Sequence, residues 1–208
     1  MKRKIISKDL KKNKYKYLFL ITVVTIGIIS GIICTNILSY NDKKEVIDIL
    51  KNYFFNLKNN QEINYMNNFF NILGTNFLYL ILMFIFGISI IGIILNIFIL
   101  YFKSFIIGFS LGSIILTYSF KGIIGAIIYM FPHIIINLII YILVCFYGIN
   151  LSIKLFKSLF LKKQFNWNEI MKKYFKILGT SSLILLITTL YETFLVNFVM
   201  KLFTFLLK

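Results

Sequence analysis

The chain has 208 residues, of which 59% are hydrophobic, and its mean hydropathy is +0.86. This composition excludes a soluble globular domain of the same length and indicates a membrane protein. The formal net charge is +16. We expect no nucleic-acid partner, because the positive charge gathers on two segments between apolar runs and no basic stretch carries a motif that reads nucleic acid.

Five apolar segments approach or exceed the length of about 20 residues that a helix needs to cross a bilayer. They cover residues 17–38, 77–100, 105–120, 123–147 and 177–203. The sequence therefore predicts an all-α polytopic membrane protein, with five transmembrane helices in a single membrane domain over residues 1–208. The first segment follows a basic stretch, as in a signal peptide, but it is long and lacks a small-residue cleavage site. We expect it to be a retained span.

The charge on the connections predicts the orientation. If the N-terminus is cytoplasmic, the inner segments are residues 1–16, Lys103 and residues 149–176, and they hold 16 of the 23 basic residues. The outer segments, chiefly the loop over residues 39–76, hold the other 7. The positive-inside rule then places the N-terminus in the cytoplasm and the C-terminus outside.

The outer loop over residues 39–76 contains an amphipathic pattern. Asp42 and Glu45 resemble a capping box, so we expect a helix to begin there. Its apolar face is our candidate partner-docking face and comprises Val46, Ile47, Leu50, Tyr53, Phe54 and Leu57. The face could instead lie on the membrane or on the protein's own helix bundle.

The inner loop over residues 149–176 repeats this pattern with basic charge. Its first half interleaves lysines with four large apolar residues, which are Leu155, Phe156, Leu159 and Phe160. Asn166 and Glu169 form a second capping pair. We expect this basic amphipathic segment to lie on anionic lipid, with a cytoplasmic partner as the alternative.

The third apolar segment is short and rich in glycine. Gly108 and Gly112 have the spacing that lets two membrane helices approach closely. Packing inside the monomer is the default interpretation, and a homodimer interface is the alternative. We expect a tight hairpin through Lys121 and Gly122 to lead into the fourth segment.

Four polar or helix-bending residues fall inside the last two segments: Pro132, His133, Asn137 and Glu192. Counting 1.5 Å per residue puts His133 and Glu192 both near the middle of the bilayer. Because an isolated charge there is costly, we expect Glu192 to face the bundle and to bond to His133, to Asn137 or to neighbours of Tyr191. This intramembrane polar cluster is either a structural clasp between the last two helices or a proton or ion site.

Catalysis and cofactors find little support in the sequence. There is no His-Glu-x-x-His pair, nucleophile elbow or phosphate loop, and one histidine cannot build a two-histidine metal site. Cys34 and Cys145 fall near opposite sides of the membrane, so we expect neither a disulfide nor a metal pair. We predict that the chain is not an enzyme and needs no cofactor.

The order of several short motifs resembles the stage II sporulation protein M family. The resemblance covers nearly the whole chain and rests on the run from Gly87 to Gly92, the segment from Lys103 to Gly112, Pro132-His133, and Glu192-Thr193-Phe194. In the family, a Gly and then an acidic residue often follow the Pro-His pair. Here Ile134 and Asn137 take those positions, which favours a structural role for the cluster.

The resemblance implies a noncatalytic membrane scaffold. Its expected partners are two membrane-anchored cell-wall hydrolases, stage II sporulation proteins D and P, at the septum or the mother-cell membrane during engulfment of the forespore. The alternative is a small membrane permease or export-complex subunit that uses the buried Glu/His pair. A continuous polar path to Glu192 would favour transport, and a closed bundle would favour the scaffold.

Overall fold

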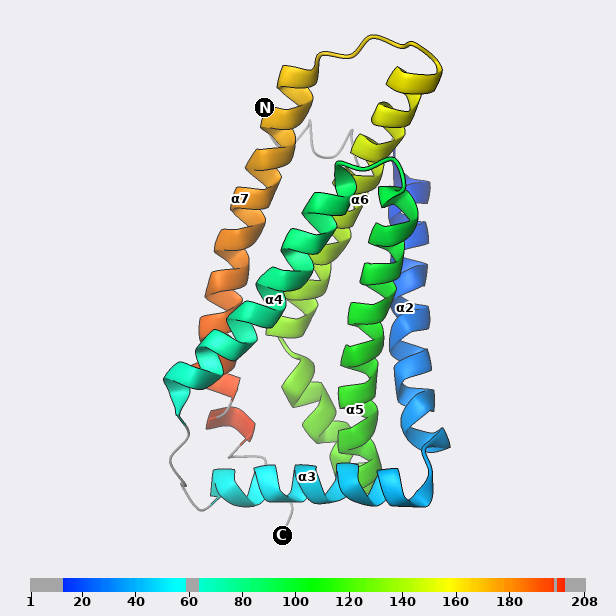
Figure 1. The fold of residues 1–208 in the computed structure, drawn as a ribbon. Helices are drawn as coiled ribbons and strands as arrows, with labels where there is room; N and C mark the ends of the chain where they lie inside the picture. The colour runs from blue at the N-terminus through cyan, green and yellow to red at the C-terminus, as the bar shows by residue number, and fades with distance from the viewer. Residues whose placement is uncertain (1–12, 59–63, 197, 201–208) are drawn as a thin grey trace.

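The computed structural model describes residues 13–58, 64–196 and 198–200, and these residues form helices with no strand among them (Figure 1). Five helices are long and apolar enough to cross a membrane, so the predicted all-α polytopic fold is confirmed. The elements are α2 (Lys14–Ile37), α3 (Tyr40–Lys58), α4 (Tyr65–Gly87), α5 (Gly92–Met130), α6 (His133–Phe160), α7 (Trp167–Tyr191) and the π-helix η1 (Glu192–Val196). Most of the predicted N-terminal tail, Lys201 and Lys208 lie outside the described residues.

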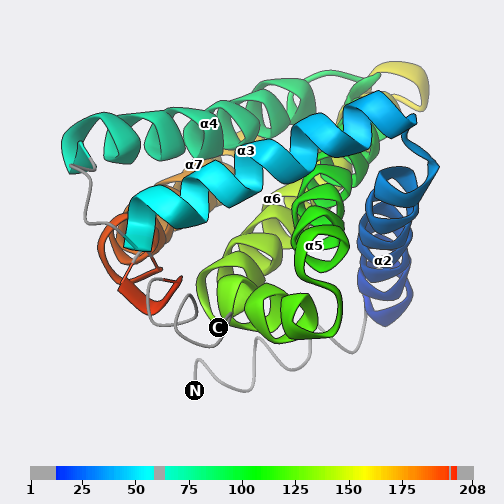
Figure 2. The ribbon, with the colours of Figure 1, turned by 90° about the horizontal axis from the view of Figure 1, so that it is seen from below.

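The amphipathic helix α3 lies across one end of the bundle, which we call the α3 end (Figures 1 and 2). The connection between α6 and α7 lies at the other end, beside the start of α2, and we call this the α6–α7 end. The predicted helix in the loop over residues 39–76 is confirmed, but its cap differs. The backbone N–H of Asp42 donates to Ser39 Oγ at 3.3 Å, and that hydroxyl donates to the Asp42 carboxylate at 2.7 Å.

The second span is present as α4, but its predicted bounds, residues 77–100, are wrong. The chain turns at residues 88–91, where the N–H of Ser89 donates to Phe86 O at 2.9 Å and that of Gly92 donates to Ser89 O at 3.1 Å. The turn stays hidden in the sequence because three isoleucines continue the apolar run through it. Its consequence is that Lys103 lies within α5 and not in a connection between two spans.

The expected hairpin before the fourth span is present, and its reversal falls at Ser119. This residue has φ 51° and ψ −126°, so the helical path of α5 breaks there. Residues 120–130, the last part of α5, run back beside the part that precedes Ser119. The close return needs a glycine, since a Cβ on Gly122 would lie 2.5 Å from the Ile114 carbonyl oxygen. A cis Phe131–Pro132 peptide then leads into α6.

Helices α2 and α5 pack against each other more closely than any other described pair, and glycines on both make the approach possible. A Cβ on Gly108 would overlap the Ile28 carbonyl oxygen, and one on Gly112 would lie 2.6 Å from Thr35 Oγ1. On the facing helix, a Cβ on Gly31 would overlap the backbone of α5. The small-residue face of Gly108 and Gly112 is therefore covered within the monomer and is not free for a homodimer.

Candidate functional site

The polar cluster forms where α6 begins and α7 gives way to η1. Pro132 caps α6, His133 is its first residue, and Glu192 opens η1. His133 Nε2 lies 3.9 Å from Glu192 Oε1, which is close contact but longer than a hydrogen bond. Within the described residues neither ring nitrogen of His133 has a hydrogen-bond partner, although the side chain is fully buried.

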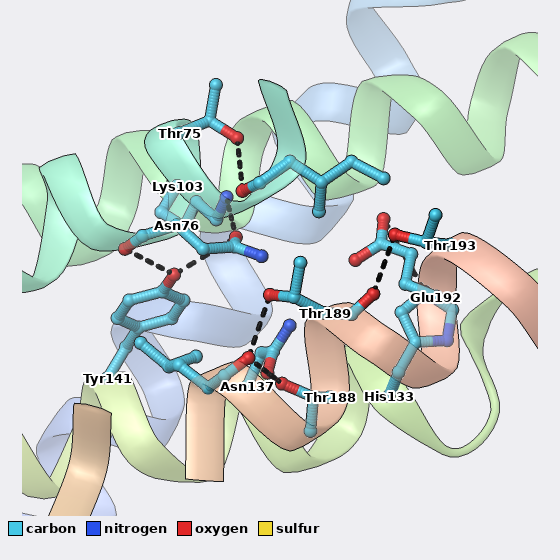
Figure 3. Close-up of polar contacts among 12 residues, drawn as sticks. Thr75, Asn76, Lys103, His133, Asn137, Tyr141, Thr188, Thr189, Glu192 and Thr193 are labelled. Carbon is cyan, nitrogen blue, oxygen red and sulfur yellow. Dashed lines mark hydrogen bonds and ion pairs between the residues drawn. The ribbon is translucent and has the colours of Figure 1, made fainter. Parts of the chain in front are cut away.

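The direct polar link between α6 and α7 is a different pair. Thr188 Oγ1 donates to Asn137 Oδ1 at 2.6 Å, and both side chains are buried (Figure 3). The expected hydrogen bond between Glu192 and His133 or Asn137 is absent from the described contacts, and Asn137 accepts from Thr188. No sequence signal singles out Thr188, since hydroxyl residues in helices more often bond their own backbone.

A second polar group, which sequence reasoning missed, gathers around Lys103 (Figure 3). The ammonium of Lys103 donates to Asn76 Oδ1 at 3.2 Å and lies 4.6 Å from the centre of the Tyr79 ring. Tyr141, which is fully buried, donates its hydroxyl to the backbone and side-chain oxygens of Asn76, both at 3.2 Å. Three helices, α4, α5 and α6, thus hold one lysine inside the bundle.

A cavity of about 90 Å³ joins the two groups. Lys103 and Asn76 line it on one side, and Glu192 and Asn137 line it on the other. A polar cavity of this size has room for water, which can bridge groups too far apart for a direct bond. The cavity places a cation and a carboxylate in one compartment, and this offsets part of the cost of holding either charge inside a membrane.

A larger groove of about 530 Å³ reaches Glu192 from the α3 end. Leu50 and Tyr53 of α3 form part of its wall, and Ser110 of α5 and Tyr129 line both the groove and the smaller cavity. The groove leads from the α3 end to Glu192 over a mainly apolar lining, and the smaller cavity continues from Glu192 to Lys103. Towards the α6–α7 end the bundle is closed by fully buried side chains: Leu80, Met83, Leu100, Val144 and Cys145.

The predicted docking face of α3 is largely turned onto the protein itself. Phe54 and Leu57 are buried in a small core with Val196 and Met200, and the Phe54 ring packs edge-on against Tyr118 at 5.2 Å. For Phe54 and Leu57 the predicted docking role is corrected, since both pack on the protein's own helix bundle. Their burial stabilises the bundle by the hydrophobic effect. Val46, Ile47 and Leu50 are half-buried, and Tyr53 remains 41% exposed.

The chemistry available to this site is limited. No group of three or more His, Cys, Asp or Glu side chains that could hold a metal ion occurs in the described part of the chain. Cys34 and Cys145 are free thiols. The arrangement can hold a charge pair, admit water and join helices through side-chain hydrogen bonds.

Comparison with known proteins gives one match. The model of the family described as stage II sporulation protein M matches residues 19–197. No curated protein and no solved structure matches the chain. The family match runs from residue 19, within α2, to residue 197, and it includes the intramembrane polar cluster.

Proposed function

Because the chain belongs to the stage II sporulation protein M family, we propose that it is a noncatalytic scaffold that recruits cell-wall hydrolases to the septum during forespore engulfment. The proposed partners are stage II sporulation proteins D and P. The family match over residues 19–197 is the observation that carries this proposal. The polar cluster then acts as a clasp that holds α4, α5, α6 and α7 in register.

The α3 end is the proposed docking side. Four large apolar residues of α3 stay exposed: Tyr40 at 82%, Ile49 at 60%, Tyr53 at 41% and Phe55 at 59%. Exposed aromatic and aliphatic side chains on a helix that crosses the end of a bundle can anchor a partner. Since the positive-inside pattern predicts that this end is extracytoplasmic, it would face hydrolase domains outside the membrane.

Affinity capture from membranes of sporulating cells tests this proposal. We expect tagged protein to retain both hydrolases and to lose them when Ile49→Asp and Phe55→Asp are combined. Asn52→Asp with Asn56→Asp is the matched control, because it places the same residue at two exposed positions of the same helix. Capture without any hydrolase, or equal retention by both variants, would contradict the scaffold or its docking side.

Transport is the second candidate, and the cavity between Lys103 and Glu192 is what favours it. The groove from the α3 end gives that cavity one approach, and its lining is mainly apolar. A permease also needs access from the opposite side, where buried Leu100, Val144 and Cys145 fill the described bundle. Capture of a nucleotide-hydrolysing subunit in place of hydrolases would favour the export alternative.

A further inference from the structure

A cavity of about 610 Å³ lies at the α6–α7 end of the bundle, far from the polar cluster. The start of α2, the end of α6, the start of α7 and the connecting loop all contribute to it. Five lysines line it: Lys16, Lys154, Lys157, Lys163 and Lys173. Among the described lining residues the one acid is Glu169.

These lysines face one another across separate elements. Lys16 of α2 is near enough to Lys157 of α6 for the two charges to repel, and Lys154 of α6 repels Lys173 of α7 in the same way. Converging like charges destabilise a fold unless a counter-charge lies between them. Lys16, Lys154, Lys157 and Lys163 outnumber the one carboxylate among the described lining residues, so the cavity favours an additional anion.

Local contacts hold several of these side chains in place. Lys16 Nζ donates to Asn150 Oδ1 at 2.6 Å, which ties α2 to α6. Lys173 lies 5.1 Å from the centre of the Tyr147 ring. Just after the end of α6, the backbone N–H of Lys163 donates to the backbone carbonyl oxygen of Lys157 at 3.3 Å. The chain therefore turns back on α6 and brings Lys163 to the cavity.

The position of the cavity identifies the kind of anion. It lies at the ends of membrane-crossing helices, where lipid headgroups gather, and buried Phe146 and Leu151 form an apolar part of its lining. Basic pockets between transmembrane helices are suited to phosphate-bearing headgroups.

We propose that this cavity is a binding site for the phosphate headgroup of an anionic phospholipid. Lys16, Lys154 and Lys157 supply the charge from two helices, and Lys163 closes over the site from the loop. A defined site differs from attraction of the whole basic segment to a charged surface, because it depends on which lysines are present and not on their number. The proposal stands independently of the scaffold function.

Native mass spectrometry of the full-length protein released from nanodiscs tests the site. We expect phosphatidylglycerol and cardiolipin to remain bound while phosphatidylcholine is lost. Combining Lys154→Gln with Lys157→Gln should weaken anionic lipid binding at least tenfold, given the contribution of each lysine near an anionic surface. Lys172→Gln with Lys176→Gln removes the same charge from exposed positions of α7 outside the cavity and should leave binding unchanged.

Thermal unfolding in neutral detergent supplies the second measurement. Anionic lipid should raise the melting temperature of the wild type and of the Lys172/Lys176 control, but not that of the Lys154/Lys157 variant. Equal lipid loss in both variants would overturn the defined site in favour of diffuse attraction. An equal rise with inorganic phosphate alone would overturn the lipid assignment and indicate a soluble phosphate ligand.

Discussion

Lys103 of α5 and Glu192 of η1 line the same cavity of about 90 Å³ inside the helix bundle. Each charge on its own would be costly at this depth, and each has polar neighbours that reduce the cost: Asn76 beside Lys103 and His133 beside Glu192. The two residues come from helices that are distant in sequence. Their shared cavity therefore couples the packing of α5 to the end of α7.

The first prediction concerns this coupling. Lys103→Met and Glu192→Gln should each destabilise the protein, because either change leaves the opposite charge without its counter-charge in a buried site. The loss should be smaller than the cost of about 3–5 kcal/mol for a buried pair in direct contact, because Lys103 and Glu192 only share a cavity. The double variant should lose less free energy of unfolding than the sum of the two single variants, as measured by reversible unfolding in mixed micelles.

Additive losses would mean that Lys103 and Glu192 do not interact across the cavity. Lys44→Met, at an exposed position of α3, is the control for loss of a lysine as such. Hydrolase capture by the Glu192→Gln variant separates the two roles of the cluster. If the cluster is a structural clasp, the folded Glu192→Gln variant should still capture the hydrolases. If the cluster is a proton relay, the same variant should lose activity.

A second prediction follows from the contact between α2 and α5. Gly31→Ala and Gly108→Ala should each cost about 1–3 kcal/mol, since each new methyl group would overlap backbone of the facing helix. Gly74→Ala and Gly179→Ala are matched controls, because nothing lies within 4 Å of a Cβ at either position. The controls should be neutral or slightly stabilising, as alanine favours helix over glycine by about 1 kcal/mol. Equal melting temperatures for all four variants would contradict the close packing.

The hydropathy of the chain predicts much of this fold. Long apolar runs predict the number of spans, and the spacing of Gly108 and Gly112 predicts a close helix contact. The turn over residues 88–91 was not predictable, because isoleucines occupy it and only Ser89 and the flanking glycines mark it. The missed turn made Lys103 look like part of a connection.

The polar partners were harder still to predict. Asn76 and Tyr141 belong to helices other than α5. Nothing close to Lys103 in the sequence therefore reveals which polar groups stabilise its charge. In the same way, Thr188 is one of several hydroxyl residues on α7, and only the packing of α6 against α7 selects it as the partner of Asn137. Residues near one another in a sequence pattern were predictable, and pairings across helices were not.

A third prediction concerns the pair of Thr188 and Asn137. Thr188→Val keeps the shape of the side chain but removes the hydroxyl that donates to Asn137 Oδ1. A buried acceptor left without a donor costs about 1–3 kcal/mol. Thr180→Val is the control, because Thr180 is exposed and bonds only its own helix at Ile177 O among the described contacts. An equal change in free energy of unfolding for both variants would show that the bond does not hold α6 to α7.

The fourth prediction concerns orientation, which determines whether the α3 end faces the hydrolases. In a Cys34→Ala, Cys145→Ala background, a cysteine at exposed Lys44 of α3 should react with a membrane-impermeant maleimide on intact cells. A cysteine at exposed Gln164, between α6 and α7, should react only after the membrane is opened. Both follow from the basic segment over residues 149–176, which lies at the α6–α7 end, even though Lys103 is removed from the count. The reverse labelling pattern would place α3 in the cytoplasm, where it could not meet enzymes that act on the cell wall, and would contradict the proposed docking side directly.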